Sequence, residues 1–367
     1  MTYKCPLCGN DSSFLVGKER AFAVLDEAVT YQPAVCAQCD MVTIYPLPDA
    51  ELLERYYASQ NRHYSDTDAY DEQAAFIDFD GYGMALDYGA YDGRLLGNLK
   101  EYANGNLTLH GIEPDGNIKF QTDYIRYKGL NSIGENQYEV VTIAHVLEHL
   151  RNPLGVLSQL ADHLGPLGRL FVEVPVLDTP YIQVVPYFIP FHLNYFSIGT
   201  LRKIVELAGL HIVKEEPTAY GAYRILAERA HTVKDVPISG DGHTLDLVAD
   251  YEQRHGVAMA IIADELMCCE GARVAIFGAG DHTEWLYRTL GPRPGPDIVA
   301  IWSSWPVPGG VRYGLPVTKV PDVIPEDIDA VIISSYDSQE EMSAIIGPKA
   351  QRLYDKTVAY DTYRKNE

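Results

Sequence analysis

The segment from Met84 to Asp115 constrains the fold more than any other part of the sequence. It reads as a strand, a turn with two glycines, a helix and a second strand that ends near Glu113. This order of elements is the first half of a doubly wound α/β sheet. In such folds small ligands bind beyond the carboxyl ends of the strands, so the turn is the expected place of a binding site. An ordinary strand-turn-helix with incidental glycines is the alternative.

The residues around this turn indicate a nucleoside cofactor. Asp87, Gly89 and Gly93 form the pattern D-x-G-x-x-x-G. Glu113 follows the second strand, at the place where an acid accepts ribose hydroxyls. The pattern differs from the G-x-G-x-x-G that holds a pyrophosphate. We therefore expect a cofactor with a ribose and no pyrophosphate, namely S-adenosylmethionine.

Length and charge limit the classes of partner. The 367 residues suffice for two or three domains, and a hydrophobic content of 47% is that of a globular protein. Apolar runs fall short of the roughly 20 residues that cross a bilayer, and the N-terminal sequence lacks an apolar signal core. The net charge of −22 disfavours nucleic acids and anionic membranes as partners. We expect a cytoplasmic enzyme that acts on a small molecule, and the sequence does not indicate the oligomeric state of the protein.

Two C-x-x-C pairs near the N-terminus predict a metal site. Each pair can present two thiolates to one ion, so the pattern favours structural zinc with four protein ligands, Cys5, Cys8, Cys36 and Cys39. The spacer between the pairs is longer than in common zinc ribbons and is expected to hold a hairpin. Disulfides are disfavoured in a reducing cytoplasm, and a redox pair would need a thioredoxin-like context that the sequence lacks.

The chain divides into five expected segments. They are a zinc-binding module (1–45), a helical bridge or lid (46–80), a cofactor-binding domain (81–230), a linker with a helix (231–270) and a C-terminal Rossmann-like domain (271–367). Helices are expected after Asp49, between Asn152-Pro153 and Gly165-Pro166, from Ser197 to Gly209, and from Leu245 to Cys269, where Cys268 and Cys269 are interpreted as packing residues. Alternating strands and helices predict a mainly parallel sheet in each large domain.

The C-terminal glycine turn carries a weaker ligand signal. It reads Gly278-x-Gly280-x-x-Thr283, without the third glycine of the dinucleotide fingerprint, and its second strand ends in Ser303-Ser304 instead of an acid. This disfavours a nicotinamide dinucleotide. Two interpretations remain: the helix after Gly280 binds a phosphate of a nucleotide-linked substrate, or the sheet only packs against and orients the other domains.

Two segments hold candidate catalytic side chains. His145-Val-Leu-Glu148-His149 matches H-x-x-E-H, but it follows a strand directly, which disfavours the helical zinc site of a peptidase. His145 should therefore lie beside the cofactor turn. His192 and Tyr195 lie in an aromatic connection that is expected to cross the open end of the sheet, where an imidazole can take a proton and a phenol can orient a substrate oxygen. A histidine that is only packed there is the alternative.

Taken together, these parts resemble the zinc-containing sugar C-methyltransferases, which act on nucleotide-linked deoxysugars. The resemblance rests on the four cysteines, the loop Asp87-Tyr-Gly-Ala-Tyr-Asp-Gly93, the sequences Gly111-Ile-Glu113-Pro114, His145-Val-Leu-Glu-His149 with Asn152-Pro153, Glu173-Val-Pro175 and the turn Gly278-Ala-Gly280. It implies an α/β fold: a Rossmann-like class I methyltransferase domain, a small N-terminal zinc module and a second, C-terminal Rossmann-like domain. The implied cofactor-binding residues are Asp87, Gly89, Tyr91, Gly93, Glu113, Pro114 and His145, and the implied catalytic residues are His192, Tyr195 and His145.

One departure from this family concerns the methylated atom. The family reads H-E-H-x-x-Y-F-S at the catalytic segment, where this chain has Pro190, Phe191 and then His192. Loss of a carboxylate weakens the case for deprotonating a carbon. Methylation of oxygen or nitrogen needs only proximity and one base, which His192 would supply. A protein that keeps the fold without the chemistry is a second hypothesis, and a zinc-dependent nucleic-acid binder is a third that the charge disfavours.

Overall fold

The computed structural model describes most of the chain and separates it into two compact units. The described residues are 3–24, 27–59, 68–114, 118–119, 121–178, 187–230, 237–267, 270–280, 283, 286, 295–306, 310–335, 339–347 and 353–354. One unit comprises Met1–Tyr181 with Phe188–Ala249, and the other comprises Ile182–Tyr187 with Asp250–Glu367. Part of the expected bridge (60–67), part of the linker (231–236), Cys268, Cys269 and residues 281–294 apart from 283 and 286 lie outside the described residues.

A small antiparallel sheet holds the N-terminal residues. Its strands are β1 (Ser13–Leu15), β2 (Arg20–Val24), β3 (Glu27–Cys36), β4 (Val42–Tyr45) and β10 (Asn194–Tyr195). β2 and β3 form the hairpin expected in the cysteine spacer. β10 comes from the aromatic connection and pairs with β4 through Asn194 opposite Thr43 and Tyr195 opposite Val42. The N-terminal sheet therefore supports a segment that lies about 150 residues further along the chain.

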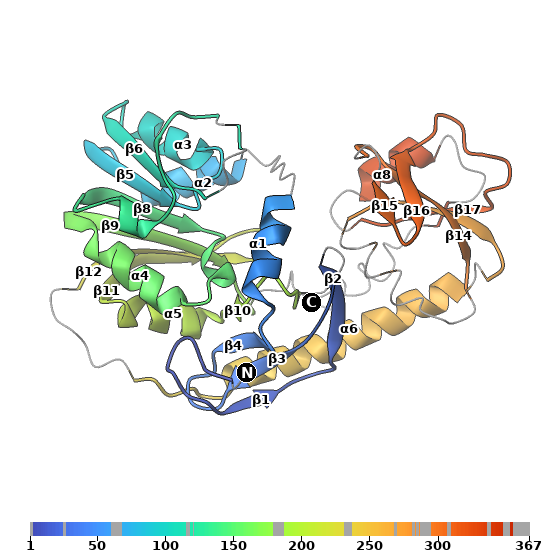
Figure 1. Cartoon of the computed structure of the whole chain (residues 1–367), viewed down its shortest axis with the longest axis horizontal. Coiled ribbons are helices and arrows are strands. Elements are labelled where there is room, and N and C mark those ends of the chain that lie inside the picture. Colours follow the sequence, from blue (N-terminus) through green and yellow to red (C-terminus); the bar gives the residue numbers. More distant parts are fainter. Residues whose placement is uncertain are drawn as a thin grey trace. The chain divides into compact units, whose positions relative to one another are not determined.

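A seven-stranded sheet forms the centre of the first unit (Figure 1). Its strands are β5 (Gly83–Tyr88), β6 (Leu107–Ile112), β7 (Ile125–Tyr127), β8 (Tyr138–Ala144), β9 (Leu164–Pro175), β11 (Leu210–Pro217) and β12 (Ala222–Arg229). The spatial order is β11-β12-β9-β8-β5-β6-β7, with β12 antiparallel to both neighbours and the strands from β9 to β7 parallel. The strand order reverses between β5 and β8, which is where ligands bind in such sheets.

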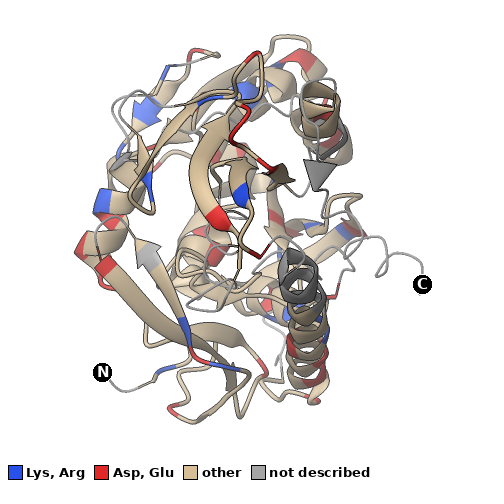
Figure 2. Ribbon diagram, turned by 90° about the vertical axis from the view of Figure 1, so that its right-hand side faces the viewer, with Lys and Arg blue, Asp and Glu red and all other residues tan. Residues whose placement is uncertain are grey.

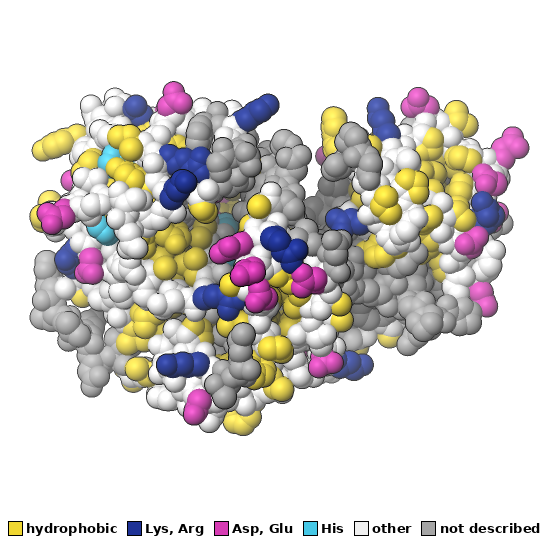
Figure 3. Space-filling view, viewed as in Figure 1, with side chains coloured by type: hydrophobic (Ala, Val, Ile, Leu, Met, Phe, Trp, Pro, Cys, Tyr) yellow, Lys and Arg dark blue, Asp and Glu magenta, His cyan; other side chains and the backbone are white. Residues whose placement is uncertain are grey.

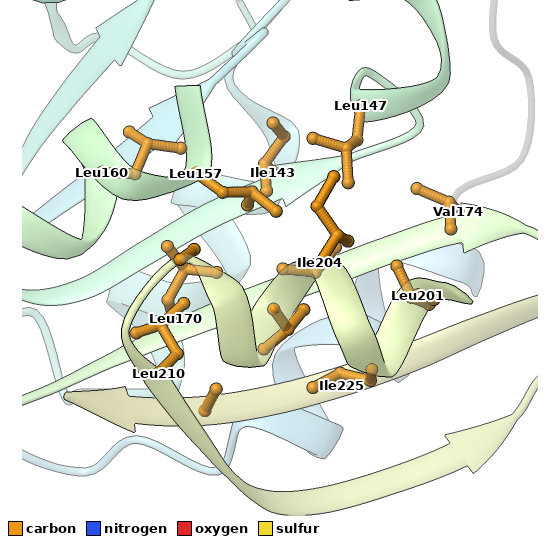
Figure 4. Packing of buried hydrophobic residues seen from close by; sticks show 14 of the residues in the cluster. Ile143, Leu147, Leu157, Leu160, Leu170, Val174, Leu201, Ile204, Leu210 and Ile225 are labelled. Carbon is orange, nitrogen blue, oxygen red and sulfur yellow. The ribbon is translucent and has the colours of Figure 1, made fainter. Parts of the chain in front are cut away.

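Helices α2 (Asp68–Ile77) and α3 (Arg94–Tyr102) cover one face of this sheet, and α4 (Pro153–Asp162) and α5 (Ile198–Leu207) cover the other. The unit also contains α1 (Ala50–Ser59) and the 3-10 turns η1 (Leu130–Ser132) and η2 (Leu147–His149). Leucines of α4 and α5 pack over β8, β9 and β12 on one face (Figure 4). Alternate residues of β9 divide between the faces, because Leu170 and Val172 join this cluster while Phe171 joins α2 and α3. A strand buried on both faces is the expected pattern for a parallel sheet.

Local signals predicted the helix starts well and one helix end poorly. Asp49 Oδ1 accepts from the backbone N–H of Glu51 at 2.9 Å, and Asn152 Oδ1 accepts from Gly155 at 3.0 Å. The expected helix end at Gly165-Pro166 is wrong, because α4 ends at Asp162 and β9 already begins at Leu164. Gly168 instead allows β9 to approach β8 closely. A Cβ on Gly168 would lie 2.5 Å from the Tyr138 carbonyl oxygen, at an irregular stretch of the β8–β9 pairing.

The second unit contains a six-stranded, mainly parallel sheet. Its strands are β13 (Arg273–Phe277), β14 (Asp297–Ser303), β15 (Val311–Arg312), β16 (Leu315–Lys319), β17 (Ala330–Ile333) and β18 (Leu353–Tyr354), in the order β15-β16-β14-β13-β17-β18. The helices within its described residues are α6 (His243–Met267), which begins in the first unit, and α8 (Gln339–Ile346). Gly278 directly follows β13. A Cβ on Gly278 would lie 2.1 Å from the Ser334 carbonyl oxygen, so close packing of the turn requires this glycine.

Charged side chains of both signs occur throughout the described part of the chain. Acidic and basic positions are spread over the ribbon in Figure 2, and several of both kinds gather near the middle of the face drawn in Figure 3. Among the described residues, no helix is long and apolar enough to cross a membrane.

Candidate active site

The turn after β5 has a backbone that requires its glycines. Gly89 and Gly93 have φ values of 88° and 82°, and Tyr91 between them has a φ of 44°. A Cβ on Gly89 would lie 2.4 Å from a methyl group of Val146, so the turn packs closely against the segment after β8. The backbone N–H of Gly89 donates to Ile112 at 2.9 Å, which ties the turn to the end of β6. The turn therefore lies where the strand order reverses.

Two buried carboxylates flank this turn. Glu113 Oε2 accepts from the backbone N–H of Tyr91 at 3.1 Å, and Asp87 Oδ1 accepts from the Thr142 hydroxyl at 2.7 Å. Burial raises the pKa of Asp87 to about 7, the Thr142 hydrogen bond opposes this shift, and the charge of Glu113 adds to it. A cationic ligand group beside Asp87 would favour its ionised form. Pro114, which the sequence also assigns to the cofactor site, follows Glu113 and is exposed.

His145 lies at the end of β8 in a conformation that non-glycine residues seldom adopt, with a φ of 53°. Its Nε2 lies 3.2 Å from Glu173 Oε1, and its Nδ1 lies 3.8 Å from Glu148 Oε1. Because a carboxylate only accepts, Nε2 carries the proton and Nδ1 offers a lone pair. Burial opposes the charged form, but the hydrogen bond to Glu173 and the charge of Glu148 raise the pKa of His145. The imidazole side chain is 41% exposed, so a ligand can reach it.

Glu173 is fully buried and lies at the centre of a polar network. Its Oε1 accepts from Gln73 Nε2 at 2.7 Å and from the Tyr220 hydroxyl at 2.8 Å. Arg224 lies directly opposite on β12, with its Nε 3.0 Å from Glu173 Oε2. Burial alone would raise the pKa of Glu173, but the hydrogen bond from His145 and these neighbours lower it. The ionised Glu173 therefore fixes the orientation of His145.

A second group of side chains gathers beside this network. Ligand atoms of Glu148, His149 and His192 all lie within 4.8 Å of one another, and the two imidazole centroids are 4.7 Å apart. Glu148 and His149 belong to η2, and His192 comes from the aromatic connection. Burial, together with the nearby His149 and His145, holds the pKa of His192 well below its usual value. His192 is therefore neutral, and the structure brings it to the open end of the sheet as the sequence predicts.

Tyr195 and Phe191 shape the connection that carries His192. The Tyr195 hydroxyl donates to the Ile189 carbonyl at 2.9 Å and accepts from the Ile189 N–H at 2.7 Å, so it closes a loop in the backbone. Phe191 stacks on Tyr56 of α1 with centroids 4.0 Å apart and meets Phe22 edge-on at 5.3 Å. The position that is glutamate in the resembling family therefore holds a buried packing residue. The two hydrogen bonds between the Tyr195 hydroxyl and Ile189 suit a role for Tyr195 in positioning the connection.

The four predicted cysteines come together as a cluster in the first unit. Their sulfur atoms all lie within 4.8 Å of one another, with 3.5 Å between Cys5 and Cys39 and between Cys8 and Cys36. A tetrahedral zinc ion with Zn–S bonds of about 2.3 Å needs sulfur atoms roughly 3.8 Å apart. The N–H of Gln38 donates to Cys36 Sγ at 3.4 Å, a contact that stabilises a thiolate. The cluster thus has the donor set and spacing that zinc requires.

Comparison with known proteins agrees with this geometry. The family model of a methyltransferase domain matches residues 59–215, which include β5 to β9, both carboxylates of the turn, His145, Glu173 and His192. The chain therefore contains a methyltransferase domain, in the α/β fold of the class I methyltransferases. A comparison with curated proteins finds no match.

Several solved structures resemble part of the chain at low sequence identity. Magnesium protoporphyrin IX methyltransferase from Synechocystis, solved with bound S-adenosylhomocysteine, has 16% identity, a TM-score of 0.38, and alignment over 50% of this chain and 100% of its own. The CcbJ methyltransferase from Streptomyces caelestis has 16% identity, a TM-score of 0.35, and coverage of 45% and 90%. An S-adenosylmethionine-dependent methyltransferase from Clostridium acetobutylicum has 8% identity, a TM-score of 0.38, and coverage of 49% and 98%.

Sequence reasoning missed several members of the site. Gln73, Tyr220 and Arg224 complete the environment of Glu173, and Thr142 holds Asp87. Only Glu173 carried a sequence signal, because it ends a strand in a short motif of the resembling family. The other residues have no local pattern, since strand pairing and helix packing bring them to the site from distant positions.

Proposed function

We propose that the chain transfers a methyl group from S-adenosylmethionine to an oxygen or nitrogen atom of a small metabolite. The observation that supports this most directly is that the turn after β5 and the His145–Glu173 pair lie at one end of the same sheet. The turn offers a close-packed backbone and two carboxylates to a ribose and an ammonium group. The His145–Glu173 pair offers a base within reach of the same place.

The proposed cofactor contacts follow the chemistry of each group. Glu113 is suited to the ribose hydroxyls, and Asp87 to the positively charged amino group of the cofactor. Gly89, Tyr91 and Gly93 supply backbone for the ligand, Pro114 follows Glu113 after β6, and His145 is next to Val146, which packs against Gly89. S-adenosylmethionine supplies an electrophilic methyl group on a sulfonium centre.

Of the two candidate bases, we favour His145 over His192. A lone pair of the acceptor atom attacks the methyl carbon, the carbon–sulfur bond breaks with its electrons on sulfur, and the acceptor loses one proton. His145 Nδ1 can take this proton because Glu173 holds the other ring nitrogen as a donor. His192 has no carboxylate in the equivalent position among the contacts described, and it is the alternative that the same experiment tests.

A nucleotide-linked sugar is the leading acceptor class. Its support is the sequence resemblance, which extends from the cysteine module to the C-terminal glycine turn. The packing of Phe191 supports oxygen or nitrogen as the methylated atom, because that position offers no carboxylate for abstracting a proton from carbon. The same packing is what an inactive, cofactor-binding scaffold would show, so activity has to be measured directly.

We further propose that the four cysteines bind one structural zinc ion. All four positions of a tetrahedral ion would be filled by protein, which leaves no place for a catalytic water. Zinc would then stabilise the sheet that holds β10, and through it the connection that carries His192.

Formation of S-adenosylhomocysteine in the presence of a panel of nucleotide-linked sugars tests the proposed function. We expect turnover with at least one sugar, and a decrease in kcat of about 10²- to 10⁴-fold in His145→Asn with binding of S-adenosylhomocysteine retained. His211→Asn, an exposed histidine on β11, is the matched control and should keep wild-type turnover. Cofactor binding without methyl transfer to any acceptor would favour the scaffold, and a loss confined to His192→Asn would exclude His145 as the base.

A further inference from the structure

We propose that Glu148, His149 and His192 bind a divalent transition-metal ion of the zinc class, at a site separate from the cysteine cluster. Two imidazoles and one carboxylate form a ligand set that zinc and iron(II) enzymes use with an open position for substrate. The three ligand atoms already lie within 4.8 Å of one another. Metal bonds of about 2.1 Å place such atoms roughly 3 to 3.5 Å apart, so a shift of about 1 Å completes the site.

The orientation of His149 favours metal binding. Its Nδ1 lies 3.0 Å from the Phe191 carbonyl oxygen, and a carbonyl only accepts, so Nδ1 carries the proton. The lone pair is then on Nε2, which lies 3.7 Å from Glu148 Oε1. The hydroxyl of Tyr57 also lies 3.0 Å from Nδ1 and further fixes the ring. A ring held through one nitrogen by a backbone carbonyl is the usual arrangement of a metal-binding histidine.

Glu148 supplies an independent indication that a cation belongs here. Its side chain is 3% exposed, and within the described part of the chain its Oε2 has no hydrogen-bond partner. The nearest atom of His145 is 3.8 Å away from Oε1, which is too far for a hydrogen bond, and His145 is already bonded to Glu173. A buried carboxylate with an unsatisfied oxygen is costly, and a bound cation removes that cost.

The backbone around the three ligands is fixed before any ion binds. The N–H of Leu193 donates to the Glu148 carbonyl at 2.8 Å, and Asn194 Nδ2 donates to the Leu150 carbonyl at 2.6 Å. These bonds join η2 to the connection that carries His192. Such preorganisation keeps two ligand-bearing segments in register.

The position of the site indicates what the ion would do. Val146, between His145 and η2, packs against Gly89 of the cofactor turn, so the segment that carries Glu148 and His149 adjoins the proposed cofactor site. At its open position it would bind a hydroxyl or carbonyl oxygen of the acceptor and lower the pKa of a bound hydroxyl. This role in catalysis rests on the proposed methyltransferase function, whereas metal binding itself does not. A metal-bound His192 cannot also act as the base, so the proposal leaves that role to His145.

Titration of cobalt(II) into the full-length, zinc-loaded protein tests the site. The cysteine cluster is filled first with one equivalent of zinc, and elemental analysis confirms its content. Wild type should then bind one equivalent of cobalt(II), with visible ligand-field bands and without the sulfur-to-cobalt charge-transfer band of a cysteine site. Glu148→Gln and His192→Asn should each weaken cobalt binding at least tenfold, and His211→Asn should leave it unchanged.

Two results would overturn the proposal: wild type that takes up no cobalt beyond the zinc, or variants that bind it as tightly as wild type. Two separate variants are used so that poor folding of one, detected by circular dichroism, does not decide the outcome. Binding of S-adenosylhomocysteine is measured on the same samples. If wild type binds S-adenosylhomocysteine but takes up no cobalt, the metal site is excluded and the proposed methyltransferase function is not affected. If wild type does not bind S-adenosylhomocysteine, the result counts against the methyltransferase function.

Discussion

At the scale of single residues, Asp87 links the cofactor turn to the pH dependence of stability. Its pKa in the folded protein is about 7, above the value of about 3.9 in an unfolded chain. The carboxyl group therefore favours the folded state fully below about pH 4, and this contribution is lost as the pH rises towards about 7. We predict that ligand-free Asp87→Asn has a higher Tm than wild type near pH 8 and a similar Tm near pH 4.

Thermal unfolding between about pH 4 and pH 8, without ligand, measures this difference. Asp123→Asn, at an exposed position, is the control and should follow wild type throughout. If the Tm of wild type and of Asp87→Asn changed with pH in parallel, burial would not raise the pKa of Asp87.

The same residue predicts a proton change on cofactor binding. A cationic amino group beside Asp87 would lower its pKa, so near pH 6 to 7 the binding of S-adenosylhomocysteine should release protons. Calorimetry in two buffers of different ionisation enthalpy detects this as a buffer-dependent heat, which should shrink in Asp87→Asn. Equal heats in both buffers would place the amino group elsewhere.

At the scale of elements, the β4–β10 pairing connects the sheet of the cysteine cluster to the aromatic connection that carries His192. We predict that Cys36→Ser, which removes one zinc ligand, lowers kcat at least tenfold while the Kd for S-adenosylhomocysteine changes less than threefold. The reason is that the cofactor turn lies on the central sheet, whereas β10 and the nearby His192, the proposed metal ligand, depend on the N-terminal sheet. Cys36→His, which keeps a zinc ligand, should retain more activity, and equal kcat values in Cys36→Ser and wild type would contradict the account.

These same elements show what the sequence could and could not predict. The βαβ unit from β5 to β6 was predictable because glycines, leucines at helical spacing and a terminal acid lie within one short segment. β10 was not, since two residues in an aromatic run give no periodic signal and their partner strand is distant. Arg224 reaches Glu173 only because β9 and β12 pair in that register. The cysteine cluster was predictable from spacing alone, because each pair specifies its own turn.

At the scale of the whole molecule, two compact units with separate cores should unfold separately. We predict two calorimetric transitions, of which S-adenosylhomocysteine raises only one. A ligand at 100 times its Kd stabilises its unit by about 2.7 kcal/mol, which corresponds to a shift of roughly 5 to 10 °C for a unit of this size. A single transition, or equal shifts of both, would show that the units unfold together.

The central claim is that the turn after β5 and Glu113 bind S-adenosylmethionine. Isothermal titration calorimetry with S-adenosylhomocysteine tests it most directly, using wild type, Glu113→Gln and the exposed control Glu101→Gln. We predict one site per chain in wild type and in Glu101→Gln. Affinity should fall about 10- to 100-fold in Glu113→Gln, the cost of hydrogen bonds to a charged group. No heat of binding in wild type, or equal affinity in Glu113→Gln, would contradict the claim.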